Sequence, residues 1–146
     1  MRQYFQYAAI LIISAMVYSC AASGNCSSAG KYKIDFSTGG GFTGIVNGTT
    51  IYCDGRVMFW ERYPNSAAQI KDSLTLQEDR LKHFNLLVQS PDVFTYSHSY
   101  SGNYTATLTI SKDSVSNTIS YNPSEEPADF PQAIKEIISE IKIIKK

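Results

Sequence analysis

Hydrophobic and polar residues alternate with a period of two in several short segments of this chain. Between positions 32 and 37, the even positions hold Tyr, Ile and Phe, while the odd positions hold Lys, Asp and Ser. Such alternation is typical of a strand that buries one face. The segments predicted as strands, by alternation or by a β-rich composition, are 32–37, 49–53, 56–62, 94–100, 104–110 and 117–121.

Short turn sequences between these segments predict antiparallel hairpins. Asp54-Gly55 separates two of the strands, and a two-residue Asp-Gly loop is the strongest short-range hairpin signal. Ser101-Gly102-Asn103 predicts a second hairpin, and residues 112–115 turn the chain once more.

Apolar residues at helical spacing predict two helices. The first begins at a capping box, in which the Thr75 hydroxyl and the Glu78 carboxylate can each accept a bond from the other's amide. It ends near Val88, because the residue before Pro91 disfavours helical geometry. Its predicted apolar face consists of Leu81, Phe84, Leu87 and Val88. The second helix carries one stripe, formed by Phe130, Ile134, Ile137, Ile138, Ile141 and Ile144.

The resulting order is strand, strand, strand, helix, strand, strand, strand, helix, which predicts the α+β class. The short links require mostly antiparallel pairing. We therefore expect a mostly antiparallel sheet of about six strands, with both helices packed on one face. The other face, rich in Thr, Ser and Lys, is expected to stay in contact with water.

The first twenty residues predict export. Arg2 precedes an apolar run, 7–17, which is shorter than the roughly 20 residues that span a bilayer. Val17-Tyr18-Ser19-Cys20 resembles the lipobox that lipoprotein signal peptidase cuts. This interpretation divides the chain into a signal peptide (1–19), a flexible tether (20–30) that starts at lipidated Cys20, and a single α+β domain (31–146).

Lipidation of Cys20 would fix the protein to a bacterial membrane. Several acyl chains, each contributing about 0.8 kcal/mol per buried CH₂ group, make such anchoring effectively permanent. In a Gram-negative cell this predicts the outer membrane, on its periplasmic side or its surface. Two alternatives stay open: an ordinary secretory signal cut near 21–23, which discards Cys20, and a retained transmembrane anchor.

The balance of charge bears on which partners the chain can bind. The chain has 13 basic and 13 acidic residues, and this balance argues against nucleic acid as a partner.

After lipidation of Cys20, only Cys26 and Cys53 remain, and an oxidising compartment lets two such thiols pair. The alternative is a buried Cys53 in a strand and a free Cys26 in the tether.

A glycine-rich run interrupts the strands and is the candidate binding loop. It comprises Gly40, Gly41, Phe42, Thr43 and Gly44. Glycine allows a positive φ and close approach to a partner, and Phe42 supplies a bulky apolar group. The alternative is a wide turn whose Phe42 folds into the core. The run lacks the lysine of a phosphate-binding loop.

This run and the order of the elements around it resemble emfourin, a small inhibitor of thermolysin-type metallopeptidases, and related uncharacterised bacterial lipoproteins. The shared features are Gly-Gly-Phe-Thr-Gly-Ile at 40–45, the Asp-Gly hairpin, a capped helix and a final helix. The resemblance implies an α+β fold over most of 31–146 and a peptidase as partner. It also places the family's glycine motif on Gly40, Gly41, Phe42 and Gly44.

Catalysis has little support in the sequence. His83 and His98 have no recognisable nucleophile or carboxylate partner, and with Cys26 and Cys53 they form no local zinc-binding pair. Glu125-Glu126 is typical of a solvated loop. We therefore expect no catalytic residues, no metal and no cofactor.

Aromatic residues offer a second candidate surface. In a strand, Trp60 lies on the face opposite Val57 and Phe59. If Val57 and Phe59 face the core, Trp60 faces outward beside Tyr52 or Tyr63. The opposite register makes Trp60 a core residue.

The expected function is a lipid-anchored, non-catalytic binding domain that recognises an envelope protein or a glycan. The alternatives are an emfourin-like peptidase inhibitor and an enzyme of unknown class.

Overall fold

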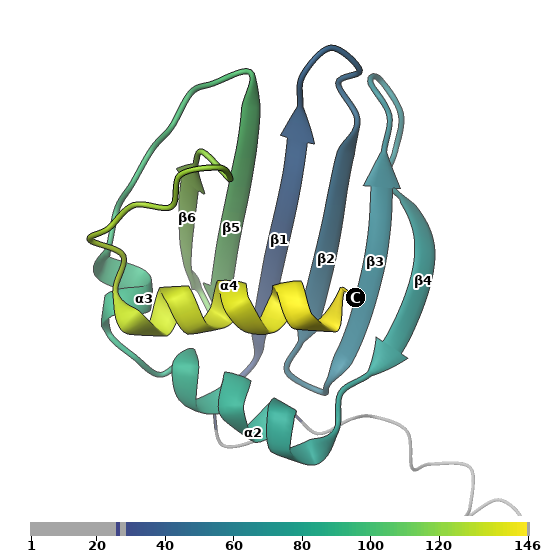
Figure 1. The fold of residues 1–146 in the computed structure, drawn as a ribbon. Helices are drawn as coiled ribbons and strands as arrows, with labels where there is room; N and C mark the ends of the chain where they lie inside the picture. The colour runs from purple at the N-terminus through teal and green to yellow at the C-terminus, as the bar shows by residue number, and fades with distance from the viewer. Residues whose placement is uncertain (1–25, 27–28, 146) are drawn as a thin grey trace, which may run out of the picture.

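The computed structural model describes residue 26 and residues 29–145, which form a six-stranded sheet with helices on one face (Figure 1). The strands are β1 (Tyr32–Gly40), β2 (Val46–Tyr52), β3 (Arg56–Arg62), β4 (Gln69–Thr75), β5 (Tyr104–Lys112) and β6 (Val115–Tyr121). The helices are α2 (Glu78–Leu87), α3 (Asp92–Thr95) and α4 (Gln132–Ile144). The predicted signal peptide (1–19) and lipidated Cys20 lie outside the described residues.

All neighbouring strands are antiparallel, in the order β4-β3-β2-β1-β5-β6. The first four strands form a meander, and its β2–β3 turn is the predicted Asp54-Gly55 hairpin. After β4 the chain passes through α2 and α3 and returns to the sheet as β5, between β1 and the edge strand β6 (Figure 1). The α+β class and the mostly antiparallel six-stranded sheet are therefore confirmed.

The core lies between the sheet and the helices. Ile34, Ile51 and Val57 pair across neighbouring strands and are fully buried. The apolar stripe of α4 lies over this face, with Ile134, Ile137, Ile138 and Ile141 buried. Each such side chain contributes about 1.5 to 3 kcal/mol by leaving water.

The predicted order of elements lacks β4, because the sequence pattern assigned no helix or strand to residues 63–74. All seven residues of β4 are exposed, and a bulge opposite Phe59 and Trp60 breaks its alternation. Leu74 therefore pairs with Val57 on the helix side, while Ile70 pairs with Trp60 on the other side. An edge strand with apolar residues on both faces gives no period of two.

The strand predicted at 94–100 is also wrong. Residues Asp92–Thr95 form α3, so the described residues hold three helices rather than two. The Asn117 side-chain amide donates bonds of 2.8 Å to the carbonyls of Val93 and Tyr96. Beyond α3, the backbone of Ser120 donates to the His98 carbonyl, so this segment lies along the edge of β6 without forming a regular strand.

The predicted capping box is wrong as well. Thr75 is the last residue of β4, and the helix N-cap is Gln77, whose side chain makes no capping bond. The Leu76 amide donates to the Gly55 carbonyl at 2.9 Å, so pairing with the β2–β3 turn holds the chain extended past Thr75. The end of α2 at Leu87, with Val88 as C-cap, agrees with the predicted end.

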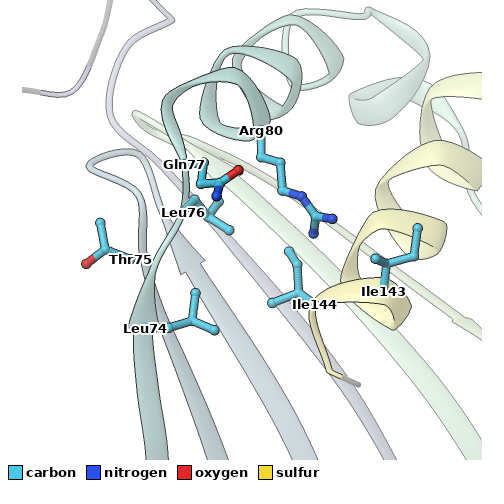
Figure 2. A pocket seen from close by; sticks show the side chains of 7 residues that line it. All are labelled: Leu74, Thr75, Leu76, Gln77, Arg80, Ile143 and Ile144. Carbon is cyan, nitrogen blue, oxygen red and sulfur yellow. The ribbon is translucent and has the colours of Figure 1, made fainter.

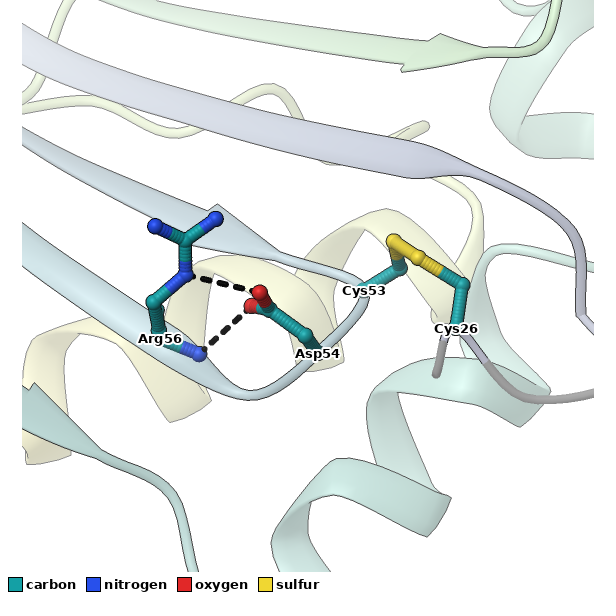
Figure 3. The surroundings of a disulfide bond; sticks show 4 residues. All are labelled: Cys26, Cys53, Asp54 and Arg56. Carbon is teal, nitrogen blue, oxygen red and sulfur yellow. Dashed lines mark hydrogen bonds and ion pairs between the residues drawn. A yellow bond between two sulfur atoms is a disulfide. The ribbon is translucent and has the colours of Figure 1, made fainter. Parts of the chain in front are cut away.

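A disulfide joins Cys26 to Cys53 beside the β2–β3 turn, as Figure 3 shows. In that turn, the Asp54 carboxylate accepts bonds from the backbone amide and the side chain of Arg56, at 3.1 Å and 2.7 Å. The chain before β1 is thus fastened to the end of the sheet where β2 turns into β3. None of the helices within the described residues has the length and apolar character needed to cross a bilayer.

Candidate functional site

The sheet face opposite the helices, here called the open face, carries few apolar side chains. On β5 and β6 it presents only hydroxyl residues, which are Thr105, Thr107, Thr109, Ser111, Ser116, Thr118 and Ser120. Two pairs of them bond across the strands, Thr109 with Thr118 at 3.1 Å and Ser111 with Ser116 at 3.0 Å. This half of the open face is an uncharged, hydrogen-bonding surface.

The other half of the open face is built around Trp60. Trp60 lies on β3 with Met58 and Arg62 on its side of the sheet, while Val57 is fully buried on the helix side. Of the two registers considered from the sequence, the structure therefore has the one that turns Trp60 away from the core.

Gly48 allows the indole to lie flat on the sheet. Gly48 pairs with Trp60 across β2 and β3, and a Cβ at position 48 would lie 2.1 Å from Cζ2 and 2.2 Å from Cε2 of the indole. No side chain other than hydrogen fits under the ring. An isolated glycine inside a strand is the sequence signal for such a close approach.

A chain of hydrogen bonds fixes the orientation of the indole. The Trp60 Nε1–H donates to Thr50 Oγ1 at 3.0 Å, and the Thr50 hydroxyl donates to Asp35 Oδ1 at 2.7 Å. Lys33 Nζ lies 2.7 Å from the other oxygen of Asp35, and this bond raises the pKa of Lys33. The aromatic ring is therefore pre-organised by three strands, and only Trp60 of this network was singled out from the sequence.

The two candidate tyrosines flank this centre at opposite ends. Tyr52 lies on the open face, and the guanidinium carbon of Arg56 is 5.0 Å from its ring centroid. Tyr63 follows β3 and is exposed, with Lys71 Nζ 5.9 Å from its ring centroid. Lys71 also pairs with Glu61 at 3.1 Å. Tyr52 thus extends the open face, whereas Tyr63 belongs to the β3–β4 turn.

The glycine-rich loop joins β1 to β2, and Phe42 at its tip is fully exposed. Its shape depends on backbone geometry, since Gly40 and Gly41 have φ of +111° and +70°, and Gly44 has φ of +63°. The Gly41 amide donates to the Asn103 carbonyl, which ties the loop to the start of β5. Thr43 accepts a bond of 3.4 Å from the Ile45 amide. Phe42 is therefore not part of the core, and the loop presents it to solvent.

The two histidines have different partners in the structure. His83 Nε2 lies 3.6 Å from a carboxylate oxygen of Glu136, and both side chains are partly exposed. His98 packs edge-on against Phe130, with ring centroids 6.2 Å apart. In the described part of the chain, no group of three or more His, Cys, Asp or Glu side chains is placed to hold a metal ion.

Several surface hollows lie among the described residues. The first, about 280 Å³, lies between the end of β4, the start of α2 and the end of α4, and Figure 2 shows Arg80 reaching into it beside Ile144. The second, about 340 Å³, contains His98 together with Glu125 and Glu126. A third, about 420 Å³, lies between residues 88–94 and the β5–β6 turn. Neither a protein-family model nor a curated protein matches this chain.

Proposed function

We propose that this protein is a lipid-anchored, non-catalytic binding domain of the bacterial cell envelope that contacts its partner with the open face. The observation that supports this most directly is the fixed indole of Trp60. Gly48 beneath the ring and the bond to Thr50 hold Trp60 in one orientation, so a partner does not have to order the side chain on binding. Pre-organised, partly exposed aromatic side chains are typical of contact sites.

The lipid anchor rests on the lipobox-like sequence at Val17-Tyr18-Ser19-Cys20. Cells producing the full chain would be fed an alkyne analogue of palmitate, and incorporation into the protein would be measured after a coupling reaction. We expect labelling of the wild type and of Cys26→Ser, and none of Cys20→Ser. Equal labelling of the Cys20 variant would contradict the anchor.

The binding surface is tested by sedimentation. The full-length protein, held in detergent, would be mixed with envelope fragments that the same detergent has stripped of lipid. We expect the wild type to sediment with the fragments, Trp60→Ala to remain in the supernatant, and Leu86→Ala to behave as the wild type. Leu86 is the matched control because it is an exposed apolar residue on α2. Sedimentation that does not depend on Trp60 would contradict the proposal.

A second function, emfourin-like inhibition of a thermolysin-type metallopeptidase, is favoured by the position of Phe42. A fully exposed phenylalanine on a glycine-rich loop is a suitable group for insertion into an apolar pocket of a partner. The test is the rate of peptide cleavage by such enzymes with increasing amounts of the protein. Inhibition that Phe42→Ala abolishes and Leu86→Ala retains would support this function, and absence of inhibition would exclude it for the enzymes tested.

A further inference from the structure

The surface around Trp60 has the chemistry of a sugar-binding platform. One side of the indole covers Gly48, so the partly exposed surface of the ring faces away from the sheet. The face of an aromatic ring carries partial negative charge, and it attracts the C–H groups that form the apolar face of a pyranose ring. The side of the indole that faces away from Gly48 is therefore the side on which such a ring would stack.

Polar groups surround the platform, as recognition of sugar hydroxyls requires. Asp35 and Thr50 lie at the pyrrole edge of the indole, where they form the bonded chain described above. Ser37 on β1 pairs with Gly48, and Thr107 on β5 pairs with Ser37, so hydroxyl groups continue from the platform across the sheet. A chain of several sugars can therefore lie across the strands without meeting a bulky or apolar obstacle at these positions.

The charge of the open face selects among sugars. Its charged strand residues are Lys33, Arg56 and Arg62 against a single carboxylate, Asp35. Lys33 is paired with Asp35, and Arg56 is paired with Asp54. Arg62, two residues beyond Trp60 on the same face, forms no ion pair with any residue of the described ranges. An unbalanced guanidinium beside an aromatic platform is complementary to a carboxylate.

From this arrangement we infer that the open face binds a glycan that carries carboxylate groups, with one pyranose ring stacked on Trp60 and a carboxylate paired with Arg62. This inference names the ligand class of the proposed function and rests on it. The binding site is formed by Asp35, Gly48, Thr50, Trp60 and Arg62. The other candidate ligands, an envelope protein or a peptidase, are outcomes of the test below.

The experiment uses the fluorescence of the full-length protein in detergent, because Trp60 is its single tryptophan. Two probes differ only in charge: cellohexaose, and the same hexasaccharide oxidised at C6 so that each glucose is a glucuronate. We expect a saturable change in Trp60 emission with the oxidised probe and about tenfold weaker binding of the neutral probe. Added salt should weaken binding of the oxidised probe and leave binding of the neutral probe unchanged.

Variants separate stacking from general effects on the fold. Gly48→Ala forces the indole off the sheet and should weaken binding by about tenfold, while Asn47→Ala, the adjacent residue on the helix side of β2, should leave it unchanged. Arg62→Ala should abolish the preference for the oxidised probe over the neutral one. Each variant's circular dichroism and unfolding midpoint report whether it folds.

The inference is overturned if neither probe changes Trp60 emission, or if Gly48→Ala binds as tightly as the wild type. Equal binding of both probes overturns the carboxylate part. If the envelope fragments capture the protein through Trp60 while the probes do not bind, the glycan inference fails and the proposed binding function stands. If the fragments do not capture the protein at all, the proposed function itself fails.

Discussion

At the scale of single residues, Gly48 and Gly40 are each required for a different reason. Gly48 has ordinary strand geometry and matters because a side chain would displace the indole of Trp60. Gly40 has φ of +111°, and a Cβ there would lie 2.2 Å from the Asn103 carbonyl oxygen. Gly48 is therefore important for the binding surface and Gly40 for the fold, so their substitution should affect different measurements.

Gly40→Ala should lower the free energy of unfolding by about 1 to 3 kcal/mol, because it combines an unfavourable φ with contact against backbone. Urea unfolding measures this loss. Gly41→Ala is the matched control, since Gly41 has φ of +70° but nothing within 4 Å of an added Cβ. It should cost less, about 1 kcal/mol. Equal losses in the two variants would show that the contact with Asn103 contributes nothing.

The burial of Tyr32 predicts that the protein becomes less stable at alkaline pH. Tyr32 is buried, its hydroxyl has no hydrogen-bond partner among the described residues, and burial, with a smaller effect from Asp54, raises the pKa of Tyr32 to about 12. A raised pKa means that the folded state holds the proton more tightly. The stability contributed by protonated Tyr32 is fully present below the pKa of tyrosine in the unfolded chain, about 10. Up to about 2 to 3 kcal/mol of the free energy of unfolding is lost as the pH rises from about 10 to 12.

Tyr32→Phe should remove that part of the alkaline loss, while Tyr104→Phe, at an exposed position, should not. The measurement is the free energy of unfolding at pH 8 and at pH 11 for both variants and the wild type. Tyr121, whose pKa burial also raises, should leave some pH dependence in Tyr32→Phe. An unchanged difference between the two pH values would contradict the assignment to Tyr32.

At the scale of elements, α4 differs from the edge strand β4 in how clearly the sequence predicts its position and its buried face. The stripe of α4 predicted both its position and its buried face, because one side of a helix packs on one core. The exposed β4 gave no such pattern, since its bulge divides Ile70 and Leu74 between the two faces. The aromatic alternation at 94–100 was misleading because Tyr96 and His98 pack around Phe130 from a segment that is not a strand.

The packing of α4 gives an element-scale prediction. Ile138→Ala removes a fully buried side chain between helix and sheet and should lower the free energy of unfolding by about 2 to 5 kcal/mol. Ile143→Ala, on the same helix but exposed, should change it by less than about 1 kcal/mol. Thermal or urea unfolding would compare them, and similar losses would mean that α4 does not pack as described.

The candidate site shows a different limit of sequence reasoning. Alternation around Trp60 offered two registers, and it is the burial of Val57 that distinguishes them. Gly48, Thr50 and Asp35 lie on neighbouring strands, so their contact with Trp60 follows from strand register, which no local pattern in the sequence determines. The exposure of Phe42 likewise depends on how its loop packs against Asn103.

At the scale of the whole molecule, the disulfide fixes the chain before β1 to one end of the sheet, while the β1–β2 loop with Phe42 lies at the other end (Figure 1). Cys26 and Cys53 are separated by 27 residues, and loop closure over this length contributes about 3.5 kcal/mol. Cys26→Ser and Cys53→Ser should each remove most of this contribution. The double variant should lose little more, measured by urea unfolding under oxidising conditions. Additive losses would contradict a shared bond.

The central claim is that the open face contacts a partner in the cell envelope. The most direct measurement is photo-crosslinking in living cells, with a photoreactive amino acid at Ser37 on the open face or at Leu86 on α2. The account predicts a discrete crosslinked adduct from position 37 that Trp60→Ala eliminates, and none from position 86. Adducts from position 86 alone, or an adduct from position 37 that persists in Trp60→Ala, would contradict it.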